Sequence, residues 1–184
     1  MAYPLKAGNF TNFGPRTILG RPDLASLIGC ICADWSYVEY STASFYSLLM
    51  GVYIDIVPGY EPPTHPVARQ IMDALPSNHA KLDLLDRLAT WVIRDEDLLA
   101  DVKSVIKKTR GSSKERNKVA HGVWGVSEAE PDALILVTPF GHKMVYKKND
   151  FENILKAIHQ TNAEMMRVHH AFYLQRRALA FKDQ

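Results

Sequence analysis

An apolar seam of about four heptads constrains the fold of this chain more than any other feature of its sequence. Apolar side chains recur between residues 24 and 52 in alternating steps of four and three. The seam consists of Leu24, Ile28, Ile31, Trp35, Val38, Thr42, Phe45, Leu49 and Val52, and Thr42 is its polar member. This spacing predicts one helix that begins at Pro22 and is roughly 45 Å long, because an α-helix rises about 1.5 Å per residue.

A second long helix is predicted near the end of the chain. Asn149 is placed to cap its first turn, with Glu152 at the third helical position. The apolar positions that follow are Phe151, Leu155, Ile158, Met165, Phe172 and Leu179. We expect this helix to continue to about Ala180.

Caps and breakers predict shorter helices between the two long ones. Thr64 can cap the first of them, and Ser77 or Asn78 starts the second. Asp95 caps a third, whose basic end suits the helix dipole and which Gly111 is expected to break.

The periodicity changes after residue 122. Two apolar runs within about residues 133–147 flank a Pro-Phe-Gly-His turn and predict a β-hairpin. Residues 1–20 are rich in Gly, Asn, Thr and Pro and are predicted to form an N-terminal arm or loop, followed by a single domain over residues 21–184. The predicted fold class is therefore all-α, a helical bundle with two long helices and a small β-hairpin inserted before the last helix.

The composition limits the class of protein. A chain of 184 residues with 47% hydrophobic and 23% charged residues is typical of one soluble globular domain. Its net charge of +2 is too small to indicate nucleic-acid binding without a local basic surface. Cys30 and Cys32 are expected to be buried free thiols, which fits a reducing cytosol. The chain shows no basic-then-apolar leader and no apolar run of about 18 residues, so we expect a cytoplasmic protein without a membrane segment.

The eight residues from Glu115 to Gly122 carry the strongest functional signal. Ser112 and Glu115 match a capping box, and Gly122 stands where a C-terminal capping glycine belongs. These signals predict a separate short helix from about Ser113 to His121. The helix would combine an arginine, an amide and a histidine, and a fixed cation beside an imidazole that titrates near neutrality suits phosphodiester chemistry.

The spacing of these side chains predicts how they are arranged. On an ideal helix, Asn117 and His121 lie about 100° and 140° around the axis from Arg116. Ala120 lies at about 40°, inside the same arc. Its small side chain leaves a gap where another backbone, or an RNA strand, could approach.

The sequence Arg116-Asn117-x-x-x-His121, followed by Gly122, resembles the R-x4-6-H signature of HEPN domains (higher eukaryotes and prokaryotes nucleotide-binding). A polar residue, often asparagine, follows the arginine in that signature. Most members of the family are α-helical bundles that dimerise. Many are metal-independent endoribonucleases of toxin–antitoxin, phage-defence or RNA-processing systems.

The resemblance implies an endoribonuclease that cleaves RNA by attack of the ribose 2′-hydroxyl on the adjacent phosphate. His121 would transfer protons, Arg116 would hold the phosphate, and Asn117 would orient the histidine or a phosphate oxygen. The implied reaction requires no metal and no cofactor, and DNA should be inert. A homodimer would bring a second catalytic set to the first across a two-fold axis near Ala120.

Four further residues are candidates for RNA binding. Lys118 adds a cation within the motif, and Trp124 either borders the site or packs in the core. His169 and Arg176 lie seven residues apart on the last helix, in a stripe that includes Asn162. That stripe either faces RNA or forms a polar edge of a bundle helix.

A hypothesis from a different functional class remains open. The chain could be a non-catalytic helical module that uses the same face to bind RNA, a nucleotide or a protein partner, because a fold can keep a surface after losing its chemistry. A cognate antitoxin or a nucleotidyltransferase is the protein partner that the toxin-like resemblance implies. The hairpin predicted soon after the motif could cover the site in either case.

Overall fold

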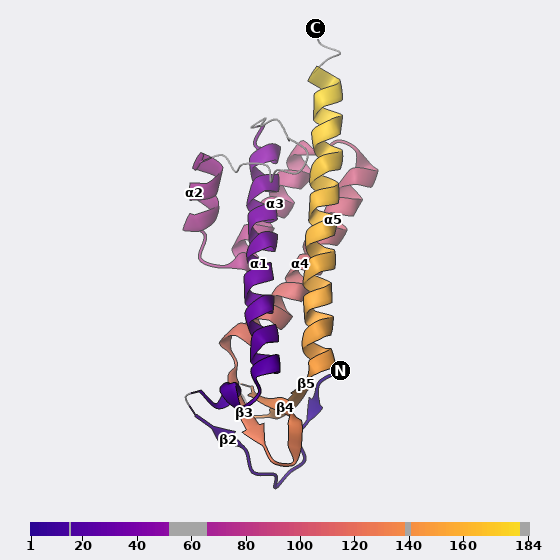
Figure 1. The fold of residues 1–184 in the computed structure, drawn as a ribbon. Helices are drawn as coiled ribbons and strands as arrows, with labels where there is room; N and C mark the ends of the chain where they lie inside the picture. The colour runs from indigo at the N-terminus through magenta and orange to yellow at the C-terminus, as the bar shows by residue number, and fades with distance from the viewer. Residues whose placement is uncertain (15, 52–65, 139–140, 181–184) are drawn as a thin grey trace. The chain divides into compact units, whose positions relative to one another are not determined.

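The computed structural model describes residues 1–14, 16–51, 66–138 and 141–180 (Figure 1). The chain divides into two compact units, one of residues 1–35 with 114–159 and the other of residues 36–113 with 160–184. In chain order the elements are β1 (Tyr3–Pro4), β2 (Asn12–Phe13), the 3-10 helix η1 (Thr17–Gly20), α1 (Pro22–Leu49), α2 (Pro66–Ala74), α3 (Asn78–Val92), α4 (Glu96–His121), β3 (Val123–Ser127), β4 (Glu130–Val137), β5 (Lys143–Lys147) and α5 (Lys148–Ala180).

An antiparallel sheet forms the centre of the first unit. Its strand order is β1-β5-β4-β3-β2, so the N-terminal segment supplies both edge strands. The prediction of an all-α fold is therefore wrong. The protein is a mixed α/β structure, mostly helical, with a five-stranded sheet.

The sheet was missed because its edges carry almost no local signal. The two strands predicted within residues 133–147 are present as β4 and β5, and Ala133 pairs with Lys147. They do not form an isolated hairpin, because β3 pairs with the other side of β4 and β1 with the other side of β5. β1 and β2 contain two residues each, too few to show an alternation of apolar and polar residues.

One face of the sheet is covered by the N-terminal segment. Ala133 and Ile135 of β4 and Val145 of β5 are fully buried on this face. Leu5 and Phe13 pack against them. Residues 1–20, predicted to be an arm or loop, thus contribute two strands and part of a small apolar core.

The opposite face carries an aromatic cluster. The ring centroid of Trp124 lies 5.3 Å from that of Tyr146 and 5.5 Å from that of Phe151. Leu134 pairs with Tyr146, and Leu136 pairs with Trp124, so both leucines lie on this face. The cluster joins β3 and β5 to the first turns of α5.

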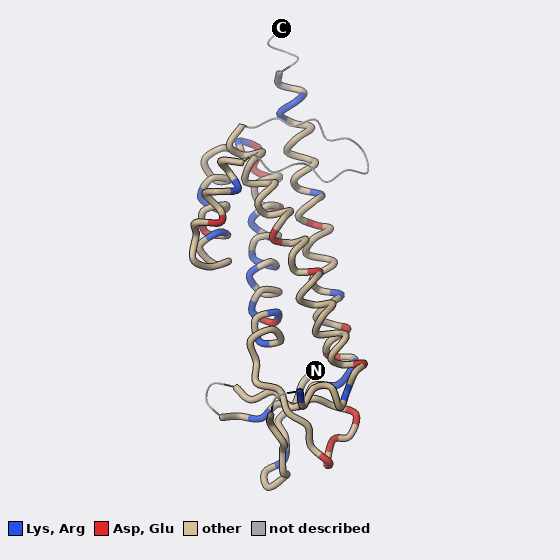
Figure 2. The backbone as a smooth tube through the Cα atoms, turned by 60° about the vertical axis from the view of Figure 1, so that its left-hand side comes forward, with Lys and Arg blue, Asp and Glu red and all other residues tan. Residues whose placement is uncertain are grey.

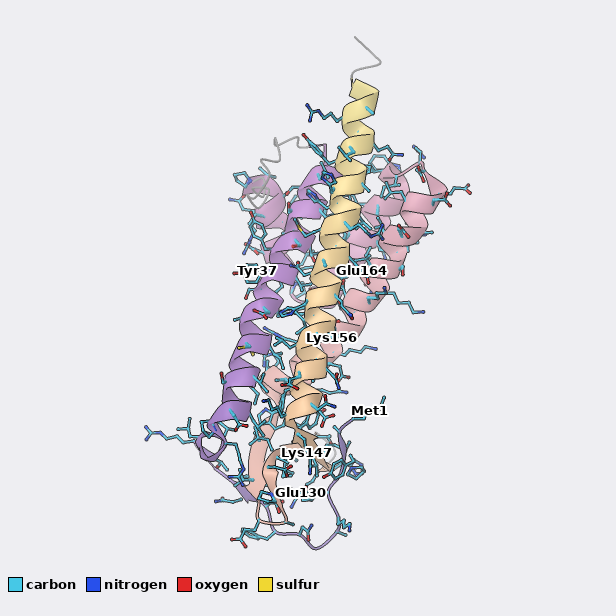
Figure 3. All side chains as sticks on the ribbon, turned by 45° about the vertical axis from the view of Figure 1, so that its right-hand side comes forward. Met1, Tyr37, Glu130, Lys147, Lys156 and Glu164 are labelled. Carbon is cyan, nitrogen blue, oxygen red and sulfur yellow. The ribbon has the colours of Figure 1, made fainter. Side chains whose placement is uncertain are left out.

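Polar and charged side chains connect β1, β5 and the start of β4. Lys147 lies 3.3 Å from a carboxylate oxygen of Glu130 and 3.3 Å from one of Asp132 (Figure 3). Hydrogen bonds to Asp132 and to Glu130 raise the pKa of the Lys147 ammonium. The Tyr3 hydroxyl also donates to Glu130, at 2.8 Å, which ties β1 to the start of β4.

All regular secondary structure in the described residues of the second unit is helical. It consists of α2, α3 and the adjoining parts of α1, α4 and α5. Its core contains the fully or almost fully buried Phe45, Leu49, Met72, Leu82, Leu85, Val102, Ile106, Met165, Val168 and Phe172. Phe45 and Phe172 meet edge to face, with their centroids 6.2 Å apart.

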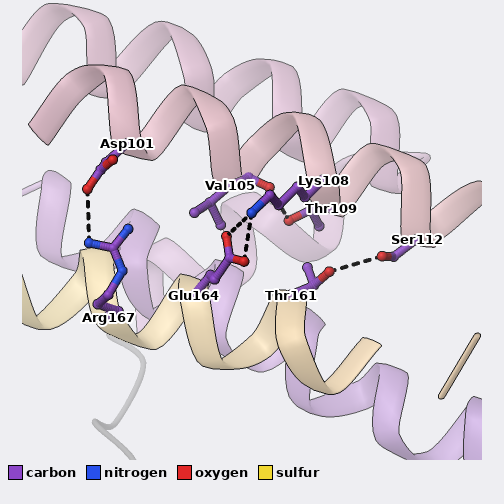
Figure 4. A network of polar contacts seen from close by, with 8 residues as sticks. All are labelled: Asp101, Val105, Lys108, Thr109, Ser112, Thr161, Glu164 and Arg167. Carbon is purple, nitrogen blue, oxygen red and sulfur yellow. Dashed lines mark hydrogen bonds and ion pairs between the residues drawn. The ribbon is translucent and has the colours of Figure 1, made fainter. Parts of the chain in front are cut away.

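Polar contacts join α4 to α5 within this second unit (Figure 4). Arg167 donates to Asp101 at 2.9 Å. Lys108 donates to Glu164 at 2.7 Å. Exposed ion pairs of this kind each stabilise a protein by about 0–1 kcal/mol, so they align the helices more than they stabilise them.

The α4 helix continues without interruption through Gly111, and the separate motif helix predicted from Ser113 to His121 is therefore wrong. Ser112 is a buried residue inside α4, and its hydroxyl lies 3.0 Å from that of Thr161. The hydroxyl of Ser113 accepts from Asn78 at 3.1 Å. These tertiary hydrogen bonds engage the serines that the capping-box interpretation assigned to a helix start.

The other predicted helix starts can be compared residue by residue. The start of α1 at Pro22 is confirmed, and so are the caps at Ser77, which accepts from the Ala80 N–H, and Asp95, which accepts from the Leu98 N–H. The cap at Asn149 is wrong, because α5 begins one residue earlier. There the Asp150 carboxylate accepts from the Lys147 N–H at 3.0 Å. Thr64, the remaining predicted cap, lies outside the described residues.

The heptad seam of α1 is buried by the chain itself. The side chains of Leu24, Ile31, Trp35, Val38, Phe45 and Leu49 are at most 3% exposed. Thr42 is also buried, and its hydroxyl donates to the Val38 carbonyl one turn earlier. Val52 lies outside the described residues. Both cysteines are free thiols, but Cys30 is exposed and Cys32 half-buried, so the expectation of two buried thiols is wrong.

Candidate functional site

The motif residues lie in the last two turns of α4, in the first unit. Arg116 is half-buried, whereas Asn117, Lys118 and His121 are exposed. His121 is the last residue of the helix, where unpaired backbone carbonyls favour a nearby cation. The strand β3 begins two residues later at Val123.

Arg116 has unused hydrogen-bonding capacity. Its Nη1 donates to Oδ1 of Asn117 at 3.2 Å. Its Nε is buried and has no hydrogen-bond partner among the described residues. Arg116 also makes no ion pair with any carboxylate in the described part of the chain. A guanidinium has five N–H donors and a permanent charge, so most of its capacity to bind an anion is free.

Asn117 connects the arginine to the histidine. Because Asn117 and His121 are four residues apart on a continuous helix, their side chains are neighbours one turn apart. Arg116 is about 140° from His121 around the axis, but its contact with Asn117 brings the guanidinium toward that side. The three side chains therefore form a row along the end of α4, with the amide in the middle.

Lys118 is already paired within the helix. Its Nζ lies 2.7 Å from Oε1 of Glu115, three residues earlier. The hydrogen bond to Glu115 raises the pKa of Lys118. This pairing leaves Arg116 as the motif cation without a carboxylate partner among the described residues.

The last part of α4 is basic. Between Lys114 and His121 the helix carries three Lys or Arg residues and one acidic residue, Glu115. Figure 2 shows blue segments recurring along this helix as it approaches β3. The small net charge of the whole chain therefore conceals a local basic surface at the motif.

Gly122 is required by packing at the junction of α4 and β3. A Cβ atom at this position would overlap the Leu136 side chain and would lie 2.5 Å from the Lys118 carbonyl oxygen. Gly122 is not among the described glycines with a positive φ. The glycine does follow the last residue of α4, as predicted, but the close approach of β4, and not a left-handed backbone, is the reason that glycine is needed here.

Trp124 is fixed beside the motif. Its indole Nε1 donates to the Val119 carbonyl at 2.9 Å, and its ring packs on Tyr146 and Phe151. It is only half-buried, so part of the ring remains at the surface. Trp124 therefore packs in the aromatic cluster and is also partly exposed to solvent.

His169 and Arg176 belong to the second unit. His169 is 3% exposed, and its Nε2 lies 3.3 Å from the Ser44 hydroxyl. The guanidinium of Arg176 lies 5.9 Å from the centroid of the Phe172 ring. The Asn162 amide oxygen accepts from Ser41 at 2.7 Å. Their surroundings are those of a polar stripe packed between helices α1 and α5.

A pocket near the motif was not anticipated from the sequence. It has a volume of about 430 Å³ in the first unit, and its lining includes Phe13, Arg16, Ile18, Val123 and Trp124. The short apolar run Val123-Trp124-Gly125-Val126, directly after the motif, was the local signal for β3. The part of the lining that comes from residues 13, 14 and 16–18 has no comparable signal.

No family model, curated protein sequence or solved structure matches this chain. The resemblance to HEPN domains therefore rests on the motif from Arg116 to Gly122. Within the described ranges, no group of three or more His, Cys, Asp or Glu side chains could hold a metal ion. None of the described helices is long and apolar enough to cross a membrane.

Proposed function

We propose that this chain is a HEPN-like endoribonuclease whose reaction uses the RNA 2′-hydroxyl as nucleophile and requires no metal. The observation that carries the proposal is the row of Arg116, Asn117 and His121 along the end of α4. In it an arginine without a carboxylate partner among the described residues contacts Asn117, and an exposed imidazole follows one turn after that amide. A permanent planar cation and a titrating imidazole are complementary to a phosphodiester.

The chemistry follows from these two groups. His121 removes the proton from a ribose 2′-hydroxyl, and the 2′-oxygen then attacks the adjacent phosphorus. The bond from phosphorus to the 5′-oxygen breaks, which leaves a 2′,3′-cyclic phosphate. The departing 5′-oxygen takes up a proton from an acid. Arg116 offsets the negative charge that gathers on the phosphate oxygens during this displacement.

A homodimer would supply the second acid–base group, and we include it in the proposal. The motif segment of one chain, residues 114–121, contains a single histidine. A second copy across a two-fold axis near Ala120 would bring another Arg116 and another His121 to the same phosphate. The heptad seam of α1 is not available for this contact, because the chain buries it internally. The dimer contact would therefore involve the exposed end of α4.

The central test replaces His121 by alanine and measures cleavage of labelled single-stranded RNA in EDTA. Loss of an acid–base group lowers such rates by about 10²-fold or more, so His121→Ala should lose cleavage to that extent while keeping its helical circular dichroism. The matched control is His142→Ala, which removes another exposed histidine of the first unit. Equal cleavage by wild type and His121→Ala would rule out the proposed mechanism.

A lysine at position 116 tests the role of the guanidinium. Arg116→Lys keeps the charge but loses the planar pair of donors, so cleavage should fall by at least about tenfold. Arg94→Lys, at an exposed position of the second unit, is the control. A fully active Arg116→Lys would mean that a point charge is sufficient at this position.

The non-catalytic alternative predicts a different result. A module that uses the same row of residues only for binding would retain RNA without cleaving it. Wild-type protein that shifts labelled RNA in a gel but produces no cyclic phosphate would support that class. The wide separation of Arg116 and His121 around the helix axis, about 140°, is the observation that favours this alternative.

A further inference from the structure

The pocket beside the motif is a concave site whose lining is held in place. Phe13 lies over Gly125 of β3, and a Cβ at position 125 would come within 2.5 Å of its ring atoms. Trp124 is fixed by its bond to the Val119 carbonyl and by the rings of Tyr146 and Phe151. The side chains of Phe13 and Trp124 are thus held in place before any ligand arrives, which lowers the cost of binding.

The segment that closes the pocket is also ordered by its own hydrogen bonds. The Gly14 carbonyl accepts from both the backbone N–H and the hydroxyl of Thr17, the hydroxyl at 2.6 Å. The Arg16 carbonyl accepts from the Leu19 N–H. Arg16 itself has a φ of 67°, a left-handed conformation that is uncommon for a residue with a side chain. These bonds hold an exposed arginine at the edge of the pocket.

The lining specifies the chemistry of a ligand. The Thr17 hydroxyl and the Trp124 N–H already have partners. The residues left to meet a ligand are therefore aromatic and aliphatic, Phe13, Trp124, Ile18 and Val123, together with the Arg16 guanidinium. Flat conjugated rings bind well to such a surface, because they stack on aromatic groups and on arginine. A phosphate or a sugar alone would not stack on the aromatic side chains of the lining.

The pocket is close to the motif along the chain. Val123 is two residues from His121, so their Cα atoms are at most about 7.6 Å apart. It is also 59% exposed, which is unusual for a β-branched residue at the start of a strand. One sugar joins a nucleobase to its phosphate. A strand with a phosphate at His121 could therefore place a neighbouring base against Val123.

We propose that this pocket binds one unpaired nucleobase of an RNA strand whose phosphate lies at Arg116 and His121. The inference rests on the proposed function, because the motif identifies the strand as RNA. It explains why an exposed valine, an exposed arginine and a half-buried tryptophan converge next to a phosphate-binding row. It also predicts that single-stranded segments are preferred, since a paired and stacked base cannot enter.

The test measures binding separately from cleavage. The probe is a fluorescein-labelled hexaadenylate with 2′-O-methyl sugars, which has no free 2′-hydroxyl to act as nucleophile, and its partner probe is the same backbone without bases. Fluorescence anisotropy of the wild type should show tighter binding of the probe with bases, by about fivefold or more, from the stacking of one base.

Two variants address the pocket itself. Val123→Trp fills the pocket with a large side chain that is common in strands. Arg16→Asn removes the guanidinium, and asparagine tolerates the left-handed backbone at this position. Each should weaken the probe with bases about fivefold or more and leave the baseless probe unchanged. Leu174→Trp, at a 49% exposed position, and Arg94→Asn are the matched controls and should bind as wild type does. Thermal melting checks that every variant is folded.

The outcomes separate this inference from the proposed function. The inference that the pocket binds a base would be overturned by either of two results. One is that the pocket variants bind both probes as wild type does, and the other is that wild type binds the two probes equally well. In that case, loss of cleavage of unmodified RNA by His121→Ala would still support the proposed endoribonuclease function. If the pocket variants weaken binding of the probe with bases but wild type cleaves no RNA, base binding is supported and the proposed endoribonuclease activity is excluded. If wild type binds neither probe, both the base-binding pocket and the proposed function are overturned.

Discussion

His169 is a buried imidazole in contact with a serine and a phenylalanine. Its Nε2 lies 3.3 Å from the Ser44 hydroxyl, and its ring meets that of Phe45 edge to face at 5.9 Å. Burial, and to a smaller extent the neighbouring His170, lower the pKa of His169 to about 4. The side chain is therefore neutral at physiological pH and serves as a polar part of the core.

This lowered pKa predicts how stability depends on pH. The unfolded imidazole takes up a proton below its ordinary pKa of 6.5, whereas the folded one stays neutral down to about 4. The free energy of unfolding should therefore be highest above pH 6.5 and fall as pH drops toward 4, by at most about 3 kcal/mol. Urea unfolding of wild type and His169→Gln at several pH values checks this.

The two variants at adjacent histidines should behave differently. His169→Gln should be less stable at neutral pH but lose less stability on acidification than wild type. His170→Gln, at an exposed position, removes only the smaller of the two causes of the lowered His169 pKa, so it should keep most of the wild-type dependence on pH. An unchanged slope in His169→Gln would assign the acid sensitivity to other groups.

Gly122 makes a second prediction at the scale of one residue. The Cβ of Gly122→Ala would overlap Leu136 and the Lys118 carbonyl, and neither a core side chain nor a backbone atom can move freely. The variant should be destabilised by about 1–3 kcal/mol, measured by urea unfolding. A neutral result would show that β4 can move away from the end of α4.

At the scale of secondary-structure elements, α4 is the helix that determines the site. Its continuity through Gly111 means that the motif belongs to a long helix and does not lie on a separate capped turn. The local cost of glycine in a helix is about 1 kcal/mol. Burial of Val105, Ile106 and Val119 on either side of Gly111 outweighs that cost.

The continuity of α4 predicts that alanine at position 111 is stabilising. Gly111 is exposed, and a Cβ there would meet no atom within 4 Å. Gly111→Ala should raise the free energy of unfolding by about 0.5–1 kcal/mol and the melting temperature by about 1–4 °C. Gly29→Ala, an equally open position inside α1, is the matched comparison. A destabilised Gly111→Ala would indicate that α4 is interrupted there after all.

At the scale of the whole molecule, the proposed homodimer makes the catalytic site a shared one. Light scattering should then give about twice the chain mass of 20.8 kDa. Mixing inactive His121→Ala and Arg116→Ala chains should restore activity, at most about a quarter of wild type if each site takes its arginine and histidine from different chains. No restoration in a verified mixed dimer, or a fully active monomer, would exclude a composite site.

The sequence alone determined those features that depend on neighbours in the chain. The 3.6-residue period located α1, and the caps at Ser77 and Asp95 located α3 and α4, because these signals act within one or two turns. The strands β4 and β5 were found for the same reason, from their run of apolar residues. The motif from Arg116 to His121 is also local, and its side chains lie on one helix as its spacing required.

Tertiary structure decided the features that depend on distant residues. β1 and β2 are strands only because β5 and β3 supply hydrogen-bond partners more than 100 residues away. Ser112 is helical because Thr161 and the packed core engage that part of α4. The pocket exists because Phe13, Gly14 and residues 16–18 lie beside Val123. No local pattern records such contacts, since their energy comes from groups that meet only after the chain has folded.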